Sequence, residues 1–224
     1  MKGVVFNFRN NKRVLKLPRI KKPSLSFGEL ISRYGIQALF FALFFMGLCV
    51  GAASGRSFDK ELCLKLDFLF VTNIEARLSM SAFEVFLACF VSYFLFIFAL
   101  FLFALSSWGF TAVPLLCVFK GFSVGLSSAF LFSAYSSAGI GFYIVVVLPG
   151  TVGFLFTLIR YSRVSMMLSL DFMRISVFED HVQRLRGKLK AFLISSLLAL
   201  LYSGACAVAD MLLWVLLADK FNLI

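Results

Sequence analysis

Three ionisable side chains stand in or beside long apolar stretches of the chain, and they are the first candidates for chemistry. They are Glu84, Lys120 and Asp210. A charge near the middle of a membrane costs at least about 2.5–3.5 kcal/mol, so it needs a partner or water. Glu84 and Asp210 fall near the outer ends of their stretches, where exposure at the interface explains them. Lys120 stands about eleven residues inside its stretch, or roughly 16 Å at helical rise.

We therefore predict that Lys120 faces the interior of a helix bundle. Its candidate partners are a backbone carbonyl at a helix break and the carboxylate of Asp210. Helical depth places Asp210 nearer the outside, so this ion pair would require a break in the helix around Pro114. Pro149 and Gly150 indicate a second break, in the next stretch. Paired broken helices are typical of transporter sites, whereas kinks relieved by neighbouring helices are commoner.

No residue pattern predicts an enzyme, a metal site or a cofactor site. The sequence contains no HExxH, P-loop or G-x-S-x-G motif. Its one histidine, His181, stands in a polar segment beside Glu179 and Asp180. Four carboxylates within residues 56–82 are matched by four basic side chains, which indicates a solvated, ion-paired surface rather than the acid pair of a hydrolase. We expect a protein that is not an enzyme and binds no cofactor or metal ion.

The composition places most of this chain in a lipid bilayer. Hydrophobic residues make up 61% of its 224 residues, and 30 residues are Phe; soluble domains average about 45–50% apolar residues. A spanning helix needs roughly 20 mostly apolar residues. Residues 34–55 and 191–209 each fit one span, and residues 85–159, where Lys120 is the single charge, could hold two, three or four. Turn-forming residues at 106–109 and 133–141 favour three.

The charge distribution tests this number independently. Nine of the 22 basic residues lie in the first 33 positions, residues 56–82 are neutral overall, and residues 160–190 carry seven basic and three acidic side chains. Basic segments stay in the cytoplasm, so an odd number of crossings must separate the neutral loop from the basic one. The sequence thus predicts an all-α, polytopic integral membrane bundle of five transmembrane helices, with the N-terminus inside and the C-terminus outside.

The expected organisation has three parts: a basic cytoplasmic segment at 1–34, a transmembrane domain at 35–217 and a short tail at 218–224. Spans are expected at about 35–55, 84–105, 109–132, 140–160 and 191–217, with an outside loop at 56–83 and an amphipathic cytoplasmic loop at 161–190. The basic clusters favour anionic lipid head groups of a cell (plasma) membrane as partners, rather than nucleic acid. A signal peptide ending near residues 52–54 is the rival interpretation, but the basic leader and the apolar run are both long for one.

Small residues recur every four positions on three of the spans, which predicts faces for close helix packing. Packing within the chain is the expected use of these faces, and a homo-oligomer is the alternative. The residues are Gly47, Gly51 and Gly55 in the first span, Gly121 and Gly125 in the third, and Ala199, Ser203 and Ala207 in the fifth.

The predicted cytoplasmic loop contains apolar residues at helical spacing: Met166, Leu170, Met173 and Val177. An interfacial helix held by the basic residues that follow explains them. A docking helix for a cytoplasmic partner is the second interpretation.

Residues 119–149 resemble the stage II sporulation protein M family. The run FKGFSVG at 119–125 is similar to the family's "KGF…G" segment, and AGIGF at 138–142 and VLP at 147–149 are similar to its later segments. The five-span layout, the basic N-terminus and the modest outside loop match as well, over about residues 35–215. The family often has Gln-Asn after the proline, where this chain has Gly150 and Thr151.

The resemblance implies a non-enzymatic membrane scaffold that holds peptidoglycan-degrading partners, the stage II sporulation proteins D and P, at the septum during engulfment. Relatives also occur in bacteria and archaea that make no spores, so the resemblance defines the family more firmly than the process. The alternative is a permease subunit of an ATP-driven transporter, with residues 162–190 docking an ATPase and Lys120 lining a substrate path.

Overall fold

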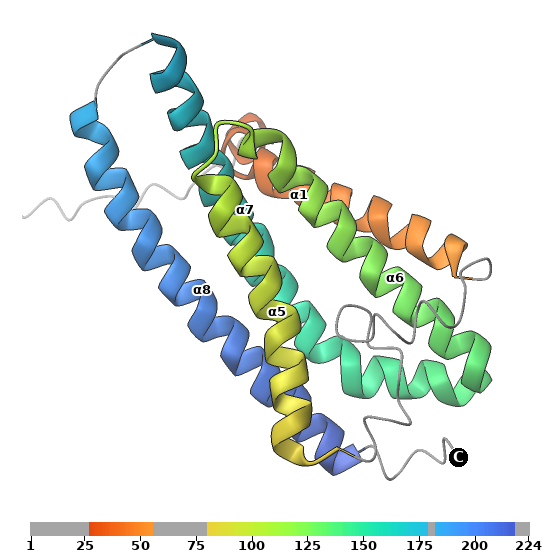
Figure 1. Ribbon diagram of the computed structural model, residues 1–224. Helices are drawn as coiled ribbons and strands as arrows, with labels where there is room; N and C mark the ends of the chain where they lie inside the picture. Colours follow the sequence, from red (N-terminus) through yellow and green to blue (C-terminus); the bar gives the residue numbers. More distant parts are fainter. Residues whose placement is uncertain (1–26, 56–79, 179–181, 218–224) are drawn as a thin grey trace, which may run out of the picture. The chain divides into compact units, whose positions relative to one another are not determined.

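The computed structural model describes residues 27–55, 80–178 and 182–217, and all regular structure in these ranges is helical (Figure 1). The chain divides into two units after residue 34, and the fold below is that of the described residues from 35 onward. The helices are α1 (Phe27–Ser54), α5 (Ala82–Ala104), α6 (Gly109–Phe142), the π-helical segment η1 (Tyr143–Val147), α7 (Leu148–Phe178) and α8 (Val182–Leu217).

Five helical segments are long and apolar enough to cross a membrane, which confirms the predicted all-helical, five-span fold. They are Gly35–Ser54, Ala82–Ala104, Gly109–Ser133, Gly139–Ile175 and Gly187–Leu217. The last two are longer than expected, because α7 continues to Phe178 and α8 begins at Val182. Most of the predicted loop at 161–190 therefore consists of helical extensions of these two spans.

The segment at 133–141, where small residues predicted a turn, is helical and belongs to α6. Gly139 lies so close to the carbonyl oxygen of Leu131 that an added Cβ would overlap it. Eight residues of straight helix would separate these positions by about 12 Å. The end of α6 is therefore sharply bent.

The two predicted helix breaks have different outcomes. The N–H of Leu148 donates to the carbonyl of Tyr143, five residues back, so η1 is a π-helical turn directly before Pro149. Single π-helical turns inside an α-helix are rare and are one of the recognised causes of a kink. Pro149 and Gly150 continue as α7. Pro114 lies inside α6, which is continuous through it. The break expected at Pro114 is therefore not present. The helix tolerates the loss of one backbone N–H at the proline.

The glycines spaced by four lie at the contact between α1 and α6. A Cβ on Gly47 or Gly51 would overlap the carbonyl oxygen of Val118 or Phe122, and Gly121 and Gly125 lie equally close to the α1 backbone. Gly55 faces the methyl group of Ala129 just after α1 ends. Close approach of backbones is the main way in which helices adhere in lipid.

The core of the bundle lies where α5, α7 and α8 pack on one another, with α6 against α5 and α7. Phe40, Phe96, Phe154 and Phe192 are among its buried side chains. On α8, the small residues predicted to share a face are all buried: Ala199, Ser203 and Ala207.

Candidate functional site

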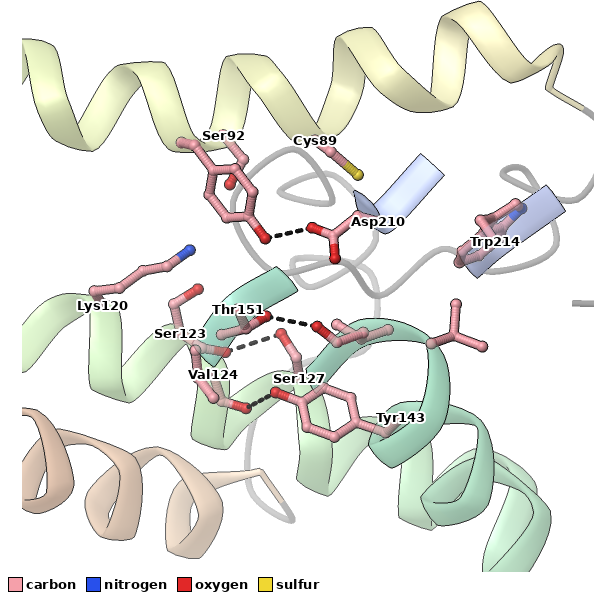
Figure 2. Close-up of a pocket in the computed structure, with 13 residues that line it drawn as sticks. Cys89, Ser92, Lys120, Ser123, Val124, Ser127, Tyr143, Thr151, Asp210 and Trp214 are labelled. Atoms are coloured by element: carbon pink, nitrogen blue, oxygen red, sulfur yellow. Dashed lines mark hydrogen bonds between the residues drawn. The ribbon is translucent and has the colours of Figure 1, made fainter. Parts of the chain in front are cut away.

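A small, partly open cavity of about 40 Å³ lies among α5, α6, η1, α7 and α8, and five of the ten buried polar side chains of the described residues line it (Figure 2). We call this cluster the polar centre. It consists of Ser92 and Tyr93 from α5, Lys120, Ser123 and Ser127 from α6, Tyr143 from η1, Thr151 from α7 and Asp210 from α8.

Lys120 is 5% exposed, and its ammonium group is surrounded by aromatic rings. Its Nζ lies 4.6 Å from the ring centroid of Phe96 and 5.4 Å from those of Tyr93 and Phe154. The rings of Tyr93 and Phe154 stack with centroids 4.3 Å apart. A desolvated cation over an aromatic face gains about 2 kcal/mol or more, so the three rings offset part of the cost of the buried charge.

Asp210 is 7% exposed, which corrects the expectation that it is exposed at the membrane interface. The hydroxyl of Tyr93 donates a hydrogen bond to its Oδ2 at 2.5 Å. The carboxylate also lies directly against Gly150, where an added Cβ would overlap it. Asp210 is buried because the rotation of α8 about its own axis directs this side chain toward Tyr93 of α5 and Gly150 of α7 instead of toward lipid.

Tyr93 connects the two buried charges. Its ring face lies beneath the ammonium group of Lys120, and its hydroxyl contacts the carboxylate of Asp210. Figure 2 shows Lys120 extending toward the cavity that Asp210 also lines. The long side chains of Lys120 and Tyr93 span the difference in depth between the two charges, so no break in α6 is needed to bring them to one site.

The neutral hydroxyl groups of the polar centre bond to helix carbonyls. Ser127 donates to the carbonyl of Ser123 at 2.9 Å, and Thr151 to that of Val147 at 2.8 Å. Tyr143 donates to the carbonyl of Val124 at 3.2 Å, which ties η1 to α6. Bonds of this kind satisfy both hydroxyls and the backbone near a disturbed helix.

Glu84 lies outside the polar centre and is exposed. It forms a capping box at the start of α5: its carboxylate accepts from the backbone N–H of Ser81 at 2.7 Å, while the N–H of Glu84 bonds to the Ser81 hydroxyl. The S-x-x-E spacing at 81–84 is the sequence signature of this cap. Glu84 thus has a structural role in starting the helix.

The candidate docking residues lie on α7. Met166, Leu170 and Met173 are partly buried, and Met166 packs against the bundle core. The side chain of Val177 lies outside the described residues. At least Met166 therefore belongs to the packing of the protein itself.

Sequence reasoning missed Tyr93, Thr151 and the serines of the polar centre. The available signal was a tyrosine deep in an apolar stretch, since a buried phenol usually finds a hydrogen-bond partner. Gly150 was predicted as part of a break, whereas its main contribution is the space it leaves for Asp210.

The polar centre can hold opposite charges and a few small molecules away from lipid. A cavity of this volume has room for roughly two or three waters. In the described parts of the chain, no group of three His, Cys, Asp or Glu side chains is arranged to hold a metal ion.

Five apolar helices long enough to cross a membrane, four of them around a charged, hydroxyl-lined centre, are typical of a multi-pass membrane protein. A family model described as stage II sporulation protein M matches residues 38–214. The chain belongs to the stage II sporulation protein M family, as residues 119–149 predicted. No curated protein and no solved structure matches it significantly. Lys120, Ser123 and Val147, all within 119–149, line the cavity.

Proposed function

We propose that this protein is a non-enzymatic scaffold of the cell membrane that recruits peptidoglycan-degrading partners for engulfment or wall remodelling. The observation that carries the proposal is the family match over residues 38–214, which includes nearly the whole five-span bundle. Proteins of the stage II sporulation D and P types are the expected partners. The segment at 56–82, predicted to face the wall, is the expected contact.

The polar centre supports a structural role within such a scaffold. Four helices contribute one main contact residue each: Tyr93, Lys120, Gly150 and Asp210. Polar contacts between helices add stability in lipid and specify how the helices are rotated and aligned. A bundle held in one arrangement would present its outer segments to partners in a constant geometry.

Site-specific crosslinking in living cells tests the scaffold. A photoreactive residue at Leu62, in the segment predicted outside, should crosslink wall hydrolases, identified by mass spectrometry. The same residue at Gly187, predicted on the cytoplasmic side, serves as the matched control and should not. Capture of no wall hydrolase at Leu62, under conditions where the cell remodels its wall, would contradict the proposal.

The charged cavity favours a permease subunit as a second candidate. Its volume of about 40 Å³ accommodates water or a small ion rather than a larger solute. Replacing Lys120 with Leu distinguishes the candidates. A permease would lose transport while still assembling with an ATPase, whereas a scaffold would show weaker stability and weaker partner capture. If the Lys120→Leu variant assembles and functions like the wild type, the polar centre has no role in either the scaffold or the permease.

A further inference from the structure

A second hollow, of about 380 Å³, lies between α7 and α8, separate from the polar centre. Its lining combines apolar side chains with one cation and several hydroxyl groups. The residues that matter here are Phe156 and Leu198, then Arg160, Thr157, Ser195 and Tyr202. We call this hollow the α7–α8 groove.

The groove opens toward lipid rather than toward the protein interior. Phe156 is 68% exposed, Tyr202 63% and Leu198 49%. In a multi-pass membrane protein, large apolar side chains with this exposure face hydrocarbon or another apolar partner. A ligand that reaches the groove therefore comes from the bilayer.

Arg160 lies well below the membrane interface, at a depth that can be measured from the turn between α5 and α6. Ser169 of the same helix donates a hydrogen bond at 2.7 Å to the carbonyl of Ser106, in the turn between α5 and α6. That turn ends two spans and carries the 78% exposed Trp108, a residue typical of the membrane interface. Arg160 precedes Ser169 by nine residues, or about 13 Å of helix, and the hydrocarbon core is only about 30 Å thick.

The guanidinium of Arg160 therefore needs an anion. Arg160 is exposed, and within the described ranges no carboxylate forms an ion pair with it. An uncompensated arginine inside a membrane is costly, and such residues pair with other groups or reach toward the interface. Ser195 lies at nearly the same depth, because the hydroxyls of Tyr161 and Ser196 are 2.8 Å apart.

We propose that the α7–α8 groove binds an anionic phospholipid from the leaflet on the side of the α5–α6 turn. The Arg160 side chain reaches toward the interface and the head group is drawn inward by local thinning of the bilayer, so that its phosphate meets the planar donors of the guanidinium. An acyl chain lies along Phe156 and Leu198. Among the described residues no Asp or Glu lines the groove, so the groove offers the ammonium group of a zwitterionic head no carboxylate to pair with. This site is independent of the scaffold function proposed above.

Native mass spectrometry of the full-length protein tests the site. Dioleoyl phosphatidylglycerol and dioleoyl phosphatidylcholine are titrated separately onto delipidated protein in detergent. The wild type should bind one phosphatidylglycerol in clear preference. Arg160→Gln should weaken that binding about tenfold, the equivalent of roughly 1.4 kcal/mol. Arg174→Gln is the matched control on the same helix, five residues beyond Ser169, and should bind like the wild type.

A second variant tests the apolar part of the groove without removing the charge. Ser195→Phe fills the groove beside Arg160 and should also weaken phosphatidylglycerol binding. Glycerol phosphate, which carries the head-group charge without acyl chains, should not displace the lipid at equal concentration. The proposed site would be overturned if Arg160→Gln bound phosphatidylglycerol as tightly as the wild type, or if Arg174→Gln lost as much binding as Arg160→Gln. Displacement of the lipid by glycerol phosphate would overturn the lipid proposal and show that the groove binds a soluble phosphate instead.

Discussion

Gly150 and Asp210 form a contact that depends on the absence of one methyl group. The carboxylate occupies the position that a side chain on Gly150 would fill. Because Asp210 also accepts a hydrogen bond from Tyr93, it cannot move aside without losing that partner. The glycine therefore has a packing role that only its neighbour on another helix reveals.

Gly150→Ala should destabilise the protein although alanine is the better helix former. We expect a loss of about 1–3 kcal/mol, the usual cost of overpacking. Thermal unfolding in detergent measures it. Gly187→Ala is the matched control, because nothing lies within 4 Å of a Cβ added there. That variant should be neutral or gain up to about 1 kcal/mol from helix propensity, and equal behaviour of the two variants would refute the contact.

Tyr93→Phe separates the two contacts of this residue. The ring beneath Lys120 remains, but the hydrogen bond to Asp210 is lost, which leaves a buried carboxylate with one partner fewer. A loss of about 1–3 kcal/mol is expected, again by thermal unfolding. Tyr202→Phe removes a hydroxyl from a residue that is 63% exposed and should change stability by less than about 0.5 kcal/mol. No difference between the two variants would argue against the bond.

At the scale of elements, α1 and α6 are joined through backbone contact. Gly47 and Gly51 face the α6 backbone while Gly121 and Gly125 face that of α1. Both helices therefore lose side-chain bulk at the same contact, which lets dispersion forces act between main chains. This arrangement assigns the glycine stripes to packing inside the chain.

Gly51→Leu should separate α1 from α6, because four added carbon atoms must enter a contact between backbones. We expect loss of the folded protein during purification, or a much lower thermal midpoint. Ala53→Leu adds a leucine side chain two positions away on the exposed face of α1 and should be tolerated. Monodisperse, wild-type-like Gly51→Leu protein on size-exclusion chromatography would contradict the packing.

At the scale of the whole molecule, the orientation in the membrane remains a prediction from charge. Alkaline phosphatase fused after His181 should be inactive in cells, because the five basic residues at 174–190 keep this segment in the cytoplasm. The same enzyme fused after Ile224 should be active. The reverse pattern would invert the assignment of every loop, including the wall-facing segment at 56–82.

The sequence by itself determined that this is a five-span membrane protein of a known family. Span number follows from the length of apolar runs and from where basic residues cluster, and both properties are local in the chain. The family followed from residues 119–149, and the interior position of Lys120 from its depth. These inferences do not require knowing which helix lies beside which.

Only the tertiary structure decided which side chains meet. Asp210 was expected at the interface, Tyr93 was overlooked, and Gly150 was interpreted as a break. A spanning helix that is apolar on all sides carries little sign of which face turns inward, so its rotation is set by contacts with neighbouring helices. That rotation brings Tyr93, Lys120, Gly150 and Asp210 together from four helices.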